Sequence, residues 1–171
     1  MNRHFKMNLS SRSITETINQ LKQLSSDVEK ARKEVVKALV VRTGELIQEN
    51  YNKTTEKPFN EDYVVKTIIS EDGLSGSALA EGDSVLYAEF GTGEIGARGQ
   101  KHPERGKFPL NDFNSGAVVS KLINKNGEHY WFYDGKYTQG IPAGLQVYNA
   151  LQTINNEKLK IARNVVRDVI W

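Results

Sequence analysis

The stretch from Ser13 to Tyr51, SITETINQLKQLSSDVEKARKEVVKALVVRTGELIQENY, decides the fold. Large apolar residues recur along it at intervals of three, four and seven, which places them on one face of a helix. This apolar stripe predicts a helix of roughly 35–40 residues, about 55 Å long. A helix of that length braces a small sheet and projects past it, where a partner can contact it. The stripe consists of Ile14, Ile18, Leu21, Val28, Val35, Leu39 and Leu46.

The start of this helix has a recognisable sequence pattern. Ser13 and Glu16 have the spacing of a capping box, in which each side chain accepts from the backbone N–H of the other residue. We therefore expect the helix to begin at Ser13 and residues 1–12 to form a flexible tail. Ser25 and Arg32 interrupt the stripe, which favours packing on the chain's own core over a strict coiled coil.

Short strands follow the helix. Residues 52–60 are polar and contain Pro58, which ends the helix. Residues 63–69 are rich in β-branched side chains and predict a strand, and residues 77–80 and 84–90 predict two more. The strands are closely spaced, and parallel strands need crossovers of a dozen or more residues, so we expect antiparallel pairing.

The middle of the chain is predicted to be a long irregular loop over residues 91–116, because seven glycines and prolines between Gly91 and Pro109 prevent sustained helix or strand. Loops of this length in compact domains are usually functional or disordered. Residues 117–123 are compatible with a short helix or a strand. Residues 129–133 and 136–139 flank Asp134-Gly135, which predicts a hairpin with a type I′ turn.

A C-terminal helix is predicted from Pro142, with apolar residues at helical spacing. The order of elements indicates one α+β domain over residues 1–171. We expect a small antiparallel sheet packed by the N-terminal and C-terminal helices, with the long loop between the central strands. The apolar positions of the final helix are Val147, Leu151, Ile154, Ile161, Val165 and Val169.

The composition excludes several classes of site. The 171 residues include no cysteine, which removes disulfides, cysteine-based zinc sites and thiol nucleophiles. Absence of cysteine fits an intracellular protein, or a particle assembled inside a cell, better than a small secreted protein. No run of about 18 apolar residues predicts a membrane span. The N-terminus also lacks the apolar core of a signal peptide.

No stretch of the sequence predicts catalysis. Gly91, Gly93 and Gly96 match a dinucleotide fingerprint after a predicted strand, but the glycines and prolines that follow prevent the helix on which a pyrophosphate would bind. The three histidines, His4, His102 and His129, lack the spacing of converging metal ligands. We expect no enzyme activity, cofactor or metal.

Charge is segregated along the chain. Residues 61–94 hold eight acidic residues and one basic residue, Lys66. Within residues 95–109, the predicted loop carries Arg98, Lys101, Arg105 and Lys107 and a single acidic residue, Glu104. Cations on a loop can bind phosphates or an acidic protein surface. Because the aromatic residues of a single-strand binder are missing, the composition favours a protein partner.

A short signature lies at the end of the acidic segment and consists of Tyr87-Ala88-Glu89-Phe90-Gly91-Thr92-Gly93. It resembles the signature of the tail-completion (tail-to-head joining) proteins of long-tailed bacteriophages. The resemblance extends to the long N-terminal helix, the aromatic hairpin at residues 131–133 and the segment from Gly140 to Leu151. Gly144-Leu145 stands where relatives often place an aromatic residue.

The resemblance implies a structural protein that forms a ring, commonly of six subunits, in the neck of the virion. Its partners would be a head-completion or connector protein and tail-terminator or tail-tube proteins, around a channel for DNA that is not bound sequence-specifically. It would be in the host cytoplasm during assembly, without binding membranes. The acidic segment 61–94 would line the channel or a subunit contact. The expected interface residues are Glu89, Gly91, Thr92, Gly93, Arg98, Lys101, Arg105 and Lys107.

Two alternative functions stay open at this point. A head-closure, tail-terminator or minor capsid subunit would differ from a tail-completion protein only in which ring it forms. A small nucleic-acid-binding protein or nuclease would instead use the basic loop and His102.

Overall fold

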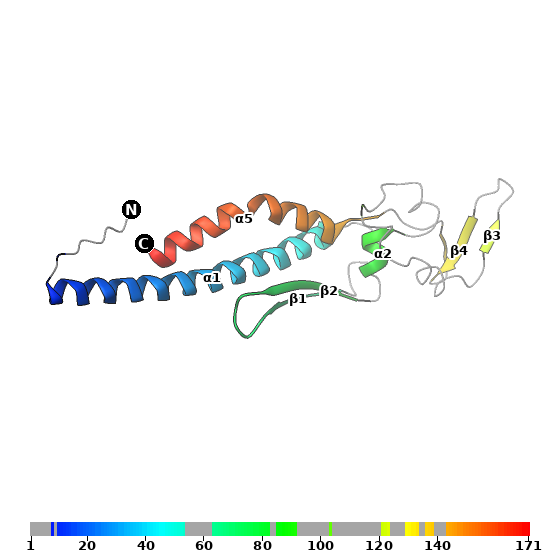
Figure 1. Cartoon of the computed structure of the whole chain (residues 1–171). Coiled ribbons are helices and arrows are strands. Elements are labelled where there is room, and N and C mark those ends of the chain that lie inside the picture. The colour runs from blue at the N-terminus through cyan, green and yellow to red at the C-terminus, as the bar shows by residue number, and fades with distance from the viewer. Residues whose placement is uncertain are drawn as a thin grey trace. The chain divides into compact units, whose positions relative to one another are not determined.

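The computed structural model describes residues 8, 10–53, 63–82, 85–91, 103, 121–123, 129–133, 136–138 and 143–171. The predicted α+β class is confirmed, with a long N-terminal helix, a C-terminal helix and a small two-stranded antiparallel sheet. The elements, in chain order, are α1 (Ser11–Lys53), β1 (Val64–Ile69), β2 (Gly76–Glu81), α2 (Val85–Phe90), β3 (Lys121–Ile123), β4 (His129–Tyr133), β5 (Lys136–Thr138) and α5 (Gln146–Ile170) (Figure 1).

The chain divides into two compact units. Unit 1 comprises Met1–Glu45, Thr67–Leu79 and Thr153–Trp171, and unit 2 comprises Leu46–Lys66 and Ala80–Gln152. The division crosses α1, both strands of the β1–β2 hairpin and α5, so these elements contribute to both units. The single-domain organisation stays a prediction.

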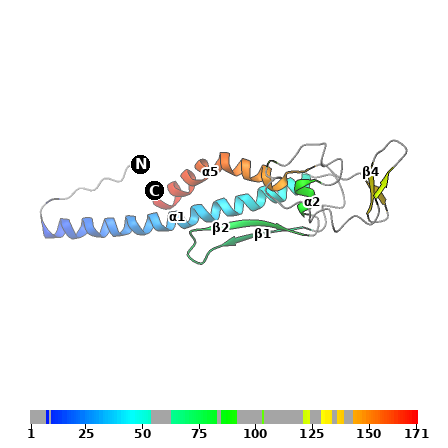
Figure 2. The ribbon, with the colours of Figure 1, turned by 45° about the vertical axis from the view of Figure 1, so that its right-hand side comes forward.

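In unit 1, α1 lies between α5 on one side and the hairpin on the other, in both views (Figures 1 and 2). Arg42 on α1 forms an ion pair with Glu157 on α5, with Nε to Oε2 at 3.4 Å. The hairpin approaches α1 closely at Gly76, where a Cβ atom, if present, would lie 2.7 Å from Val40 Cγ2 and 2.7 Å from the Ile68 carbonyl oxygen. A glycine at this position therefore lets the strand pack against the helix.

The first turn of α1 is capped by Ser10. Its hydroxyl accepts from the Ser13 backbone N–H at 3.3 Å, and its carbonyl accepts from Ile14 N–H at 3.0 Å. The Asn8 side chain in turn accepts from the Ser10 N–H at 3.0 Å, which fixes the chain before the helix. The predicted capping box is therefore wrong: Ser13 is already inside the helix, and Glu16 pairs with Arg12 at 3.1 Å instead.

The turn between β1 and β2 is held by side-chain oxygens. Asp72 Oδ1 accepts from the Ser70 hydroxyl at 2.6 Å and from the Leu74 N–H at 2.9 Å. These bonds favour the ionised carboxylate and lower the pKa of Asp72, with the Ser70 bond the largest cause. Gly73 follows with φ 72°, a conformation that glycine adopts without steric cost. The strands predicted at residues 63–69 and 77–80 are thus confirmed as β1 and β2.

A second sheet has the strand order β3-β4-β5, with both pairs antiparallel. The predicted hairpin is confirmed by β4 and β5, where Tyr133 is the partner of Lys136. The turn type at Asp134-Gly135 lies outside the described residues. Residues 121–123 of the ambiguous stretch 117–123 form β3, with Leu122 opposite Tyr130.

The strand predicted over residues 84–90 is wrong, because Val85–Phe90 is the helix α2. A short, continuous apolar run cannot by itself distinguish a strand from a buried helix. Here Val85, Ala88, Glu89 and Phe90 are buried while Leu86 is exposed, so the burial does not alternate as it would along a strand with one buried face. Gly91, with φ 72°, follows the last helical residue, as a C-terminal cap requires.

The C-terminal helix begins at Gln146, four residues later than predicted. Pro142 lies outside the described residues, and residues 143–145 precede the helix. The backbone N–H groups of Gly144 and Leu145 donate to carbonyls of α2, at 2.7 and 3.3 Å. The helix begins after Leu145, because φ 56° at this residue lies outside the α-helical region.

Replacing Gly76 with alanine is expected to destabilise the protein, because the new methyl group would overlap Val40 and the β1 backbone. We expect a loss of about 1–3 kcal/mol in the free energy of unfolding, the usual range for overpacking. Chemical denaturation of Gly76→Ala and of the control Ser77→Ala, at an exposed neighbouring position, measures the difference. Equal stability of the two variants would contradict the close helix–hairpin approach.

Candidate functional site

The α2–α5 junction of unit 2, formed by residues 88–91 and 143–148, contains the described residues of the signature. Its centre is Glu89, which is only 5% exposed. Glu89 Oε2 accepts from the Val147 N–H at 2.8 Å, and Oε1 accepts from the Tyr148 N–H at 2.9 Å. The carboxylate therefore caps the first turn of α5, where unsatisfied N–H groups and the helix dipole both favour a negative charge.

The cap comes from α2 because α5 has no suitable residue of its own. Leu145 occupies the capping position, since its carbonyl accepts the first helical bond from Asn149 at 2.8 Å. Its aliphatic side chain cannot accept from the N–H groups, as serine or aspartate would. Leu145 also has φ 56°, a left-handed conformation that is unusual for a leucine. Contacts with α2 must maintain that conformation.

Hydrogen bonds also run in the opposite direction across the junction. The carbonyls of Ala88 and Glu89, at the end of α2, accept from the N–H groups of Gly144 and Leu145. The end of α2 and the start of α5 therefore satisfy each other's backbone groups. The sequence between the two helices is flanked by Gly91 and Ala143. Both residues are therefore adjacent to the same set of backbone hydrogen bonds.

The last turn of α1 completes this buried polar cluster. Asn50 Nδ2 donates to the Gln146 carbonyl at 2.9 Å. Tyr51 is fully buried and stacks on Tyr63, with ring centroids 4.4 Å apart. The Tyr63 hydroxyl donates to Asn52 Oδ1 at 2.7 Å, which anchors the residue before β1 on the end of α1.

Burial raises the pKa of the Tyr51 phenol well above its usual value near 10, and the negative charges of Glu89 and Tyr63 raise it further. The Tyr51 hydroxyl has no hydrogen-bond partner among the described residues. A neutral hydroxyl is tolerated at such a position far better than a phenolate. Tyr51 therefore stays protonated throughout the physiological pH range.

This arrangement holds three helices together by their ends. Each oxygen of Glu89 accepts a backbone N–H, so the chemistry of the carboxylate is that of a structural cap. Among the residues that the structure describes, no cluster of three or more histidine, aspartate or glutamate side chains could hold a metal ion. None of the described helices has an apolar stretch that could cross a membrane.

The structure describes only part of the predicted interface. Glu89 and Gly91 lie together at the junction, Glu89 inside it and Gly91 half-buried at its edge. The remaining predicted interface residues lie outside the described residues: Thr92, Gly93, Arg98, Lys101, Arg105 and Lys107. Sequence reasoning did not predict the roles of Asn50, Tyr51 and Leu145. Asn50 and Tyr51 were visible only as the end of the long helix, and Leu145 carries no local signal for a positive φ.

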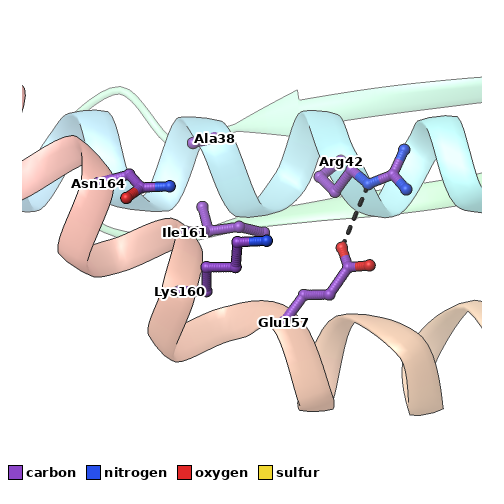
Figure 3. Close-up of a pocket in the computed structure, with 6 residues that line it drawn as sticks. All are labelled: Ala38, Arg42, Glu157, Lys160, Ile161 and Asn164. Atoms are coloured by element: carbon purple, nitrogen blue, oxygen red, sulfur yellow. Dashed lines mark hydrogen bonds and ion pairs between the residues drawn. The ribbon is translucent and has the colours of Figure 1, made fainter.

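A shallow groove lies between α1 and α5 in unit 1 (Figure 3). Arg42 lies on one side and pairs with Glu157 across the groove and with Glu45 on its own helix, at 3.4 and 3.1 Å. These partly exposed ion pairs contribute about 0–1 kcal/mol each. Because its arginine is already paired with two carboxylates, we interpret the groove as part of the helix packing. The lining residues are Ala38, Arg42, Glu157, Lys160, Ile161 and Asn164.

No known protein family matches this chain. Neither does any curated protein or any solved structure.

Replacing Glu89 with alanine would leave two N–H groups at the start of α5 without their acceptor in a buried position. We expect a loss of about 2–4 kcal/mol in the free energy of unfolding, since each bond to a charged group is worth about 1.5–3 kcal/mol and water can replace part of it. Glu89→Gln keeps one side-chain acceptor and is expected to lose roughly half as much. Denaturant titration followed by circular dichroism measures both values. A loss below about 0.5 kcal/mol for Glu89→Ala, typical of an exposed position, would contradict the cap.

The raised pKa of Tyr51 predicts a loss of stability at alkaline pH. Below pH 10 the residue is neutral in both states; as the pH rises above 10, the unfolded state ionises first and gains stability relative to the folded state. The melting temperature of the wild type should therefore fall more steeply between about pH 10 and 12 than that of Tyr51→Phe. Parallel curves for the two proteins would show that Tyr51 is not buried as described.

Proposed function

We propose that this protein is a structural neck protein of a long-tailed bacteriophage, which completes the tail and joins it to the head as part of a ring. The observation that carries the proposal is the α2–α5 junction. The two stretches with the strongest resemblance to tail-completion proteins, Tyr87–Gly93 and Gly140–Leu151, are distant in sequence. Their described residues meet through the bonds of Glu89, Ala88, Gly144 and Leu145.

The junction also suggests how the basic residues could serve assembly. The sequence between α2 and α5 begins beside Gly91 and returns at Ala143, and both ends are adjacent to one set of hydrogen bonds. That sequence includes the four cations at residues 98–107. Because both ends of this segment start from the same set of bonds, the segment has less conformational entropy to lose when it binds a partner. This arrangement favours a protein-binding role for the segment.

In the proposed role, the protein acts without cofactor or catalysis and is located in the virion neck after assembly in the host cytoplasm. Copies form a closed ring around the DNA channel, through head-to-tail contacts between unlike surfaces. One side of the ring contacts a head-completion or connector protein, and the other contacts tail-terminator or tail-tube proteins. DNA passes through the channel without sequence-specific binding.

Assembly in a phage that encodes this chain tests the proposal. With the gene disrupted, we expect DNA-filled heads and finished tails that stay separate, and purified protein should join them in an extract. Electron microscopy counts the joined particles. Normal virions without the protein would contradict the proposal, whereas loss of closed heads or of finished tails would favour a head-closure or tail-terminator role.

The basic segment allows a sharper version of the same assay. Reversing its four cations to glutamate should abolish joining while leaving the melting temperature unchanged, because the charges are proposed to meet a partner. The control variant replaces four exposed cations elsewhere in the chain with glutamate and should still join heads to tails. Metal-dependent DNA cleavage that is lost with His102→Ala would instead establish the nuclease alternative. The reversed residues are Arg98, Lys101, Arg105 and Lys107, and the control residues are Lys37, Lys53, Lys158 and Arg163.

A further inference from the structure

The N-terminal part of α1 presents apolar side chains that the described part of the chain does not cover. Ile14, Ile18, Leu21 and Val28 are 37%, 46%, 49% and 42% exposed, and none of residues 11–30 is buried. Full burial on α1 begins only at Ala31. In unit 1, this end of the helix, shown in blue, extends past α5 and the hairpin in both views (Figures 1 and 2).

The spacing of these residues indicates what kind of surface could cover them. Positions 14, 18, 21, 25 and 28 alternate steps of four and three, which is the seam of a coiled coil, and Ser25 is its one polar member. We call Ile14, Ile18, Leu21 and Val28 the exposed stripe. A helix gains most of its stability by packing an apolar face, and a seam of this period packs best on another helix with the same period.

The charges of this segment argue against nucleic acid or membrane as the occupant. Residues 11–30 contain three basic residues, Arg12, Lys22 and Lys30, and three acidic residues, Glu16, Asp27 and Glu29. Helices that bind anionic lipid or phosphate backbones carry an excess of lysine and arginine. A segment without net charge has no such excess, and two copies of it approach each other without net repulsion.

We propose that the exposed stripe is a self-association surface and that its occupant is the exposed stripe of a second copy of this chain. The exposed stripe spans the 15 residues from Ile14 to Val28, which makes it about 22 Å long and about 10 Å wide. Its area is smaller than the roughly 800 Å² per partner of a standard interface. Pairing through the stripe alone is therefore weak and depends on concentration. The association is a property of the purified chain and does not require the neck role.

Sedimentation velocity of the purified full-length chain over a range of micromolar concentrations tests the surface. The wild type should gain mass as its concentration rises, and Ile18→Glu with Leu21→Glu should weaken association at least ~tenfold by placing charges in the seam. The control, Asn19→Glu with Gln20→Glu, adds the same charge to the opposite face and should associate like the wild type. A wild type that stays monomeric, or equal weakening in both variants, would overturn the proposal.

The absence of cysteine allows a second, independent readout. A single thiol introduced by Ser25→Cys lies in the seam and should form a disulfide-linked dimer under mild oxidation, whereas Gln20→Cys on the far face should not. Equal crosslinking at the two positions, or none at either, would contradict the pairing. If the Ile18→Glu, Leu21→Glu variant associates as strongly as the wild type, the stripe proposal fails and the ring proposal is unaffected.

Discussion

The contact between the Glu89 carboxylate and the first turn of α5 is the constraint on which unit 2 depends. A buried carboxylate is costly unless it is hydrogen-bonded, and the N–H groups at a helix start are costly if they stay unsatisfied. At the junction the two requirements are met together, at 2.8 and 2.9 Å. Leu145, which has a left-handed conformation, directly precedes this first turn.

The α2–α5 junction and the N-terminal part of α1 differ in how their side chains are satisfied. Around Glu89, part-buried hydrogen bonds join the ends of α1, α2 and α5. The sequence between α2 and α5 starts and ends beside these bonds. The other end of α1 leaves an apolar seam exposed. This exposed seam is the observation behind the self-association proposed above.

The sequence was sufficient to predict those elements whose structure is decided by neighbouring residues. The long helix, the β1–β2 hairpin and the β4–β5 pair all follow from periodicity and turn residues. It was insufficient where distant residues take part: the apolar run at residues 84–90 has the composition of a strand but forms α2, whose carbonyls accept bonds from Gly144 and Leu145. Nothing near Leu145 in sequence signals its conformation. Glu89 was predicted as an interface residue, because burial inside one chain cannot be distinguished from burial in an interface by sequence alone.

The most direct measurement is electron cryomicroscopy of tailed particles whose genome encodes this chain. We expect a ring of density at the head–tail junction that fits α1 with α5 and the hairpin as unit 1, and the Glu89 junction as part of unit 2. Particles that contain the protein elsewhere, or complete particles that lack it, would contradict the proposed neck role.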